Sequence, residues 1–135
     1  MKDSLAAGLE TSRRITVDRE RTIGFMGEEG RVYATPRLVQ DIEATCRDLL
    51  LEHLDPGEDS VGTRVELDHT AATLEGMWVE IDAKLAKLDG RAASFEFTAR
   101  DTLDDVARGR HNRFIVDVAK TKERLAAKAA KAKGA

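Results

Sequence analysis

The chain has 135 residues and a mass of 14.9 kDa, which suits one domain, since domains usually take roughly 100–200 residues each. Its net charge of −3 is unevenly spread. Residues 119–135 carry six basic side chains and one acidic side chain, which leaves the rest of the chain at about −8. A body of that charge argues against binding to nucleic acid. The longest aliphatic run has three residues, far too few to span a membrane.

Cysteine and histidine usage argues against metal and disulfide chemistry. The single cysteine, Cys46, cannot form an intramolecular disulfide or a thiolate cluster. The three histidines, His53, His69 and His111, do not have metal-ligand spacing, and no glycine-rich phosphate loop opens a helix. We therefore expect no metal and no bound cofactor. The first residues lack the apolar core of a signal peptide, which favours a cytoplasmic protein.

The first half of the chain predicts a strand, a loop and a long helix. Residues 12–18 alternate weakly between polar and apolar, as in a strand, and three glycines interrupt residues 24–31. Residues 36–54 then show helical spacing, with Thr35 as one candidate for the N-cap and Pro36 in the first turn. The apolar positions of this helix are Leu38, Val39, Ile42, Cys46, Leu49 and Leu50.

After residue 57 apolar residues recur at every second position, which is typical of strands. An Asp-Gly pair at residues 89–90 predicts a hairpin between the second and third of these strands, and a fourth strand is expected over residues 105–118. Residues 119–135 are rich in Ala and Lys and predict a solvated helix. The alternating positions are Val65, Leu67 and His69, then Met77, Val79, Ile81 and Ala83, then Ala93, Phe95, Phe97 and Ala99, then Phe114, Val116 and Val118.

This order predicts an α+β fold in which an antiparallel sheet curls around one central helix, the hot-dog architecture. We expect this domain to cover residues 1–118, with residues 119–135 as a basic tail. Much of the apolar content is alanine, so the core is small. A chain with a small core often buries further surface against a second copy of itself.

Two polar residues lie on faces that the pattern assigns to the core. Glu43 lies four residues after Val39 on the apolar stripe of the helix. A buried carboxylate there suits a base or nucleophile, whereas the alternative is an ion pair with Arg47 one turn later. His69 alternates with aliphatic residues, so it is either a hydrogen-bonded core residue or a group that exchanges protons.

Other candidates have simpler alternatives. The hydroxyl of Thr35 either caps the helix or binds a carboxylate, a water or a thioester oxygen, although Thr35 and Glu43 are about 12 Å apart along an ideal helix. Cys46 is expected to pack in the core. His111 is either a second site residue or a sheet residue paired with a carboxylate.

Three segments carry a resemblance to a known family. They are VYATPRLVQDIEATC at residues 32–46, HLDPGEDSVGTRVELDHTAAT at residues 53–73 and GRHNRFIV at residues 109–116. Together they resemble the fluoroacetyl-CoA thioesterase family of hot-dog proteins. The resemblance implies a homodimer that hydrolyses acyl-CoA thioesters, with Thr35, Glu43 and His69 in a site at the dimer interface.

The chain departs from the family pattern in two places. The segment before Thr35 is several residues shorter and lacks a Phe- and Pro-rich lid, so the resemblance does not extend to selectivity for fluoroacetyl-CoA, and the acyl group stays open. Pro36 has no backbone N–H to stabilise a thioester oxyanion. That role would pass to the amides of Arg37 or Leu38, or to side chains.

The sequence thus predicts an acyl-CoA thioesterase for a small acyl group. Glu43 activates water or attacks the thioester carbon, His69 of the facing subunit assists proton transfer, and Thr35 orients one of them. Covalent and water-mediated attack stay open, as do dimer and tetramer. The alternatives are a non-catalytic acyl-CoA binding protein, an interaction module without ligand, and a hydratase, although Asp68 faces away from His69.

Overall fold

A computed structural model describes all residues from 1 to 135. Two short 3-10 turns, Arg19–Arg21 and Glu28–Gly30, interrupt the segment between the first and third strands. In chain order the other elements are β1 (Glu10–Thr16), β2 (Thr22–Ile23), β3 (Val32–Tyr33), α1 (Thr35–Leu51), β4 (Glu58–His69), β5 (Trp78–Asp89), β6 (Ala92–Arg100), β7 (Asp105–Asp117) and α2 (Val118–Gly134).

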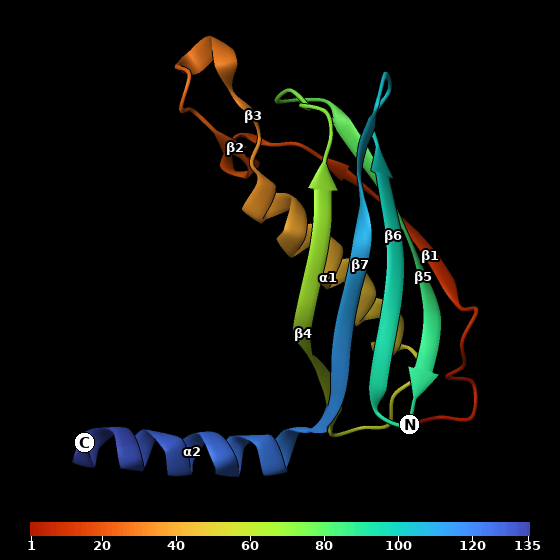
Figure 1. The fold of residues 1–135 in the computed structure, drawn as a ribbon, viewed down its shortest axis with the longest axis vertical. Coiled ribbons are helices and arrows are strands. Elements are labelled where there is room, and N and C mark those ends of the chain that lie inside the picture. The colour runs from red at the N-terminus through yellow and green to blue at the C-terminus, as the bar shows by residue number, and fades with distance from the viewer.

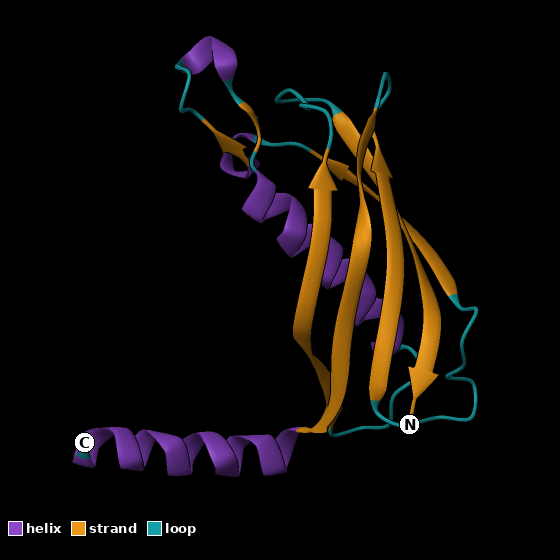
Figure 2. Ribbon diagram, viewed as in Figure 1, coloured by secondary structure: helices purple, strands orange, loops and turns teal.

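Five strands form one antiparallel sheet in the order β1-β5-β6-β7-β4, while β2 and β3 pair separately. The sheet curves around α1, which crosses its concave face diagonally (Figures 1 and 2). This arrangement confirms the predicted α+β hot-dog fold. It places the beginning of α1 beside the end of β4 (Figure 1).

The core lies between the apolar stripe of α1 and the inward side chains of the strands. Alternate residues of β5 and β6 are buried, as the period of two predicts. Cys46 is completely buried, which confirms its packing role, and burial raises the pKa of its thiol to about 12. The largest fully buried apolar side chains are Tyr33, Phe95, Leu38, Ile42, Leu50, Ile81, Leu85 and Ile115.

The structure corrects three predicted boundaries. Thr35 is the first residue of α1 and Ala34 is the N-cap, so the expected capping role of Thr35 is wrong. The helix ends at Leu51 instead of residue 54, and the first strand covers residues 10–16 instead of 12–18. The Asp-Gly hairpin is confirmed, because Asp89 pairs with Ala92 across a turn that includes Gly90 at φ 59°.

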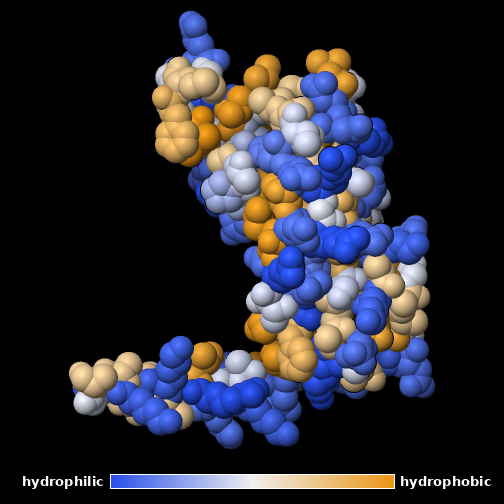
Figure 3. Space-filling view, viewed as in Figure 1, coloured by the Kyte–Doolittle hydropathy of each residue, from blue (hydrophilic) through white to orange (hydrophobic).

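The sheet ends at β4, whose outer edge has no partner strand in the chain. Val61 and Val65 are exposed on this strand, and hydrophobic atoms are visible beside it in Figure 3. An exposed strand edge with apolar side chains is a template for pairing with another chain.

The helix α2 leaves the end of β7 and extends away from the body, beyond the β4 edge (Figures 1 and 3). None of its residues is buried. Neither helix is long and apolar enough to cross a membrane.

Candidate functional site

Thr35 and His69, two of the three predicted site residues, are in contact within one chain. The hydroxyl oxygen of Thr35 lies 2.8 Å from Nδ1 of His69. Thr35 begins α1 and His69 ends β4, so the contact joins the helix to the edge of the sheet. The hydroxyl that was expected to cap the helix instead positions an imidazole.

The segment that follows β4 explains why these residues meet. The amide of Thr70 donates to the carbonyl of Val106 over 2.7 Å, which fixes the strand end against β7. The carbonyl of Thr73 accepts from the amide of Tyr33 over 2.8 Å, just before α1 begins. The HTAAT segment therefore lies across the beginning of the helix and holds His69 next to Thr35.

The Thr35–His69 pair lines a pocket of about 480 Å³. The second ring nitrogen of His69, Nε2, is buried and has no hydrogen-bond partner. Burial lowers the pKa of His69 below 6.5, so the ring is neutral at pH 7. The other lining residues are Ile23, Phe25, Val32, Tyr33, Ala34, Pro36, Thr70, Ala71 and Ala72.

The amides expected to stabilise an oxyanion are already used. Those of Arg37 and Leu38 both donate to the carbonyl of Ala34 over 3.0 Å, so the expectation for these two donors is wrong. The amide of Thr35 forms no hydrogen bond within the chain. The Thr35 amide, at the start of the helix, is therefore available to donate to a ligand.

Glu43, the third predicted residue, lies two turns further along α1 and forms no hydrogen bond with Thr35 or His69. Its carboxylate Oε1 lies 3.8 Å from Nε2 of His111 and 3.8 Å from Nη1 of Arg113. The side chain is 40% exposed, so the expectation of a fully buried acid is wrong for the single chain. The alternative of a pair with Arg47 is also wrong, because that guanidinium binds Asp59.

Gly62 on β4 makes room for the Glu43 carboxylate. A Cβ atom at this position would collide with Oε1 of Glu43 and approach Cε1 of His111 to 3.3 Å. The register of β4 against β7 also shifts between Gly62 and Arg64. The acid therefore lies directly over the backbone of the edge strand.

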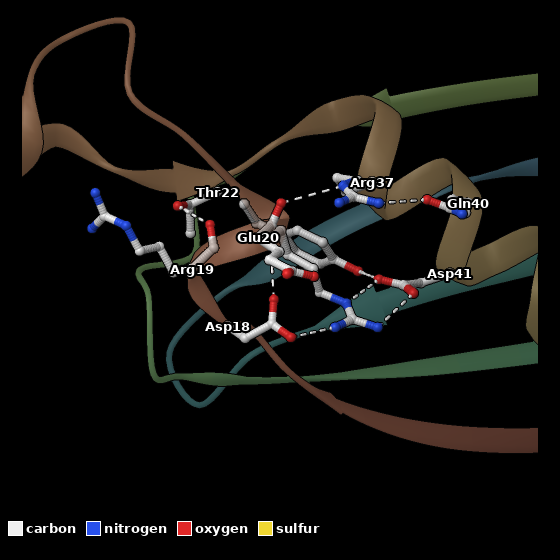
Figure 4. Close-up of polar contacts among 9 residues, drawn as sticks. Asp18, Arg19, Glu20, Thr22, Arg37, Gln40 and Asp41 are labelled. Atoms are coloured by element: carbon white, nitrogen blue, oxygen red, sulfur yellow. Dashed lines mark hydrogen bonds and ion pairs between the residues drawn. The ribbon is translucent and has the colours of Figure 1, made fainter.

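A polar network anchors the wall of the pocket to α1 (Figure 4). Arg21 binds the Asp41 carboxylate with two donors, Nε over 2.9 Å and Nη2 over 3.1 Å, and binds Asp18 over 2.8 Å. The hydroxyl of buried Tyr33 also donates to Asp41. Sequence reasoning missed this network, for which the only signal is the position of Asp41 on the core side of the helix.

No cluster of three or more His, Cys, Asp or Glu side chains in the structure could hold a metal ion. The candidate site offers four reactive groups of its own. They are an imidazole with a free ring nitrogen, a hydroxyl, a carboxylate on the same helix and an unpartnered amide.

An antiparallel sheet wrapped around one helix defines a hot-dog protein. The model of the fluoroacetyl-CoA-specific thioesterase family matches residues 17–119, and the chain belongs to this family. Membership confirms the predicted resemblance and the predicted enzyme class, a thioester hydrolase.

Known relatives match almost the whole chain. The fluoroacetyl-CoA thioesterase of Streptantibioticus cattleyicolor is 31% identical over 127 residues, which cover 89% of this chain and 91% of that protein. A solved structure of a fluoroacetyl-CoA thioesterase superposes with a TM-score of 0.86 at 28% identity, over 93% of this chain and 98% of the other. A thioesterase superfamily member from Thermus thermophilus reaches 0.89 at 28% identity, over 98% and 99%.

Proposed function

We propose that this protein hydrolyses small acyl-CoA thioesters with Thr35, Glu43 and His69. The observation that carries the proposal is His69, which lines a largely apolar pocket, is in contact with Thr35 and has a buried Nε2 with no hydrogen-bond partner. An unpaired buried polar atom is costly unless a ligand or water satisfies it. A thioester or the attacking water is the partner that family membership suggests.

We further propose that a second copy completes the site by pairing at the β4 edge. An antiparallel pairing centred near Val65 brings Gly62 of one strand opposite His69 of the partner subunit. Glu43 lies over Gly62, so its carboxylate then faces the imidazole of the other chain. This arrangement explains why Glu43 and His69 do not meet within one chain.

The chemistry follows from these positions. Glu43 takes a proton from a water molecule as the water oxygen bonds to the thioester carbon, and the Thr35 amide binds the oxyanion. The C–S bond then breaks, and the proton passes through His69 to the leaving CoA sulfur. In the covalent alternative Glu43 attacks the carbon itself, and water later hydrolyses the anhydride.

Release of free thiol from a series of short acyl-CoAs tests this function. Glu43→Gln and His69→Ala should each lower kcat by about 100-fold, the scale of a lost general acid or base. Glu52→Gln, an exposed acid at the end of α1, is the control and should leave the rate unchanged. Stabilisation by acyl-CoA without thiol release would instead support a non-catalytic binding protein, and an unchanged rate in Glu43→Gln would exclude this mechanism.

A further inference from the structure

His111, in the middle of β7, is completely buried and has a defined tautomer. Its Nδ1 lies 2.8 Å from the carbonyl oxygen of Arg64 on β4. A carbonyl can only accept a hydrogen bond, so Nδ1 carries the proton.

The other ring nitrogen faces a cation. Nε2 of His111 lies 3.1 Å from Nη1 of Arg113, and a guanidinium can only donate, so Nε2 must accept with its lone pair. The ring is therefore neutral. Burial lowers its pKa, and the charge of Arg113 acts in the same direction. The approach of Nε2 to Glu43 is thus not an ion pair.

Arg113 is held on three sides. Besides the contact with His111, its Nε donates to the hydroxyl of Ser60 over 2.7 Å and its Nη2 donates to the Ser60 carbonyl over 2.8 Å. These bonds fix the plane of the guanidinium and leave the second hydrogen of Nη1 unused. That nitrogen lies 3.8 Å from Oε1 of Glu43.

The Glu43 carboxylate is the nearest negative charge for this cation. Arg113 is only 5% exposed, and a buried charge is costly without a counter-charge. Asp59, the other acid nearby, binds Arg47 with two hydrogen bonds. Glu43 itself accepts no hydrogen bond within the chain, so its position is restricted by Arg113, the close backbone of Gly62 and the neighbouring His111 ring.

We propose that His111 is a positioning residue, a neutral imidazole that joins the Arg64 carbonyl to the Arg113 guanidinium and so keeps Nη1 of Arg113 facing the Glu43 carboxylate. The inference rests on the proposed role of Glu43. A carboxylate that is held in one place loses less freedom when it reacts, and this raises kcat without changing how substrate binds.

Two substitutions separate this role from simple packing. In His111→Asn the amide nitrogen takes the place of Nδ1 and keeps the bond to Arg64, whereas in His111→Gln the amide oxygen takes the place of Nε2 and keeps an acceptor for Arg113. We expect Gln to retain kcat within about threefold and Asn to lower it by about tenfold or more, both with KM within about twofold. A packing role predicts instead that kcat follows thermal stability in the two variants.

A second measurement does not depend on activity. Nitrogen-15 NMR of the ring at pH 7 should show a neutral His111 with its proton on Nδ1, and Arg113→Leu should shift the Nε2 resonance. A charged ring, or a proton on Nε2, would overturn the positioning role. So would equal kcat values in the Asn and Gln variants. If no acyl-CoA is hydrolysed at all, the proposed function fails, and the ring measurement still decides whether His111 holds Arg113.

Discussion

At the scale of single residues, the place of Glu43 depends on an absent side chain. Gly62 lies directly under the carboxylate, and any Cβ there would collide with Oε1. Because Gly62 has no positive φ, alanine fits the backbone, and the collision with Glu43 is the main consequence of the substitution. Conformational freedom of the backbone is therefore not the reason for glycine at this position.

Gly62→Ala should lower kcat by about tenfold or more, because displacement of a reacting group by about 1 Å can cost up to 100-fold. Thermal stability should change little, since Glu43 is half-exposed and can turn away. Gly134→Ala, where no atom lies within 4 Å of the added carbon, is the matched control. A Gly62→Ala enzyme with normal kcat would show that the carboxylate does not react from this place.

Tyr33 connects the pocket wall to the helix through a single hydroxyl. Tyr33→Phe removes the hydrogen bond to Asp41 but leaves both bonds from Arg21. We expect a loss of about 1–2 kcal/mol in the free energy of unfolding, measured with urea, because the site is buried. Loss of the exposed Ser12 hydroxyl, which binds Asp82, should cost less, and equal losses would contradict a special role of the Asp41 network.

At the scale of elements, one half-buried and one fully buried imidazole make the stability of the sheet depend on pH. His69 ends β4 and His111 lies in β7, and burial lowers both pKa values below the usual 6.5. The unfolded chain therefore binds more protons than the folded chain just below pH 6.5, so stability must fall as the pH falls through this range. Above about pH 7 both rings are neutral in the folded and in the unfolded chain, so they no longer make stability depend on pH.

Urea unfolding at pH 7.5, 6.5 and 5.5 should show this loss. His111→Gln should lose less stability than the unchanged protein between pH 6.5 and 5.5, because one of the two titrating rings is gone. The carboxylates with lowered pKa values, such as Glu28 at about 2, act only at lower pH. If the free energy of unfolding falls equally with pH in the two proteins, His111 is not a neutral buried ring.

The elements themselves were largely predictable from periodicity, whereas the site contacts were not. Apolar residues spaced by three and four positions predicted α1, and apolar residues at every second position predicted β5 and β6. The bond from Thr35 to His69 joins residues 34 apart, and local patterns contain no information on such contacts. The capping prediction failed for that reason, since Thr-Pro is a good local signal but a tertiary partner took the hydroxyl.

The burial predicted for Glu43 is only partial, for a related reason. The helical stripe placed it on the core side, but its neighbour β4 is the last strand of the sheet, so part of the side chain stays exposed. His111 was singled out with two alternatives, and the structure puts it next to a carboxylate. Arg113, which joins the two, lies in the GRHNRFIV segment that carries the family resemblance, but the sequence pattern gave no sign that it contacts Glu43.

At the scale of the whole molecule, the unpaired β4 edge predicts the oligomer. Val65→Lys places a charge on the exposed face of that edge and should weaken pairing between copies. We expect sedimentation to shift from dimer toward monomer, with kcat/KM falling in parallel because the proposed site uses residues of both chains. Leu103→Lys, which adds the same charge at a more exposed residue outside the strands, should change neither. Full activity in a monomeric variant would contradict a shared site.

The basic helix α2 does not pack against the rest of the chain along its length (Figure 1). Its residues are all unburied, and its removal leaves a body of about −8 charge. Deletion of residues 119–135 should therefore change the melting temperature by less than about 2 °C, since surface groups contribute little to stability. The comparison should be made at two protein concentrations, because α2 extends past the β4 edge, where the second copy is proposed to bind. A melting temperature that falls by more than about 5 °C, and falls further on dilution, would show that α2 packs on the partner subunit.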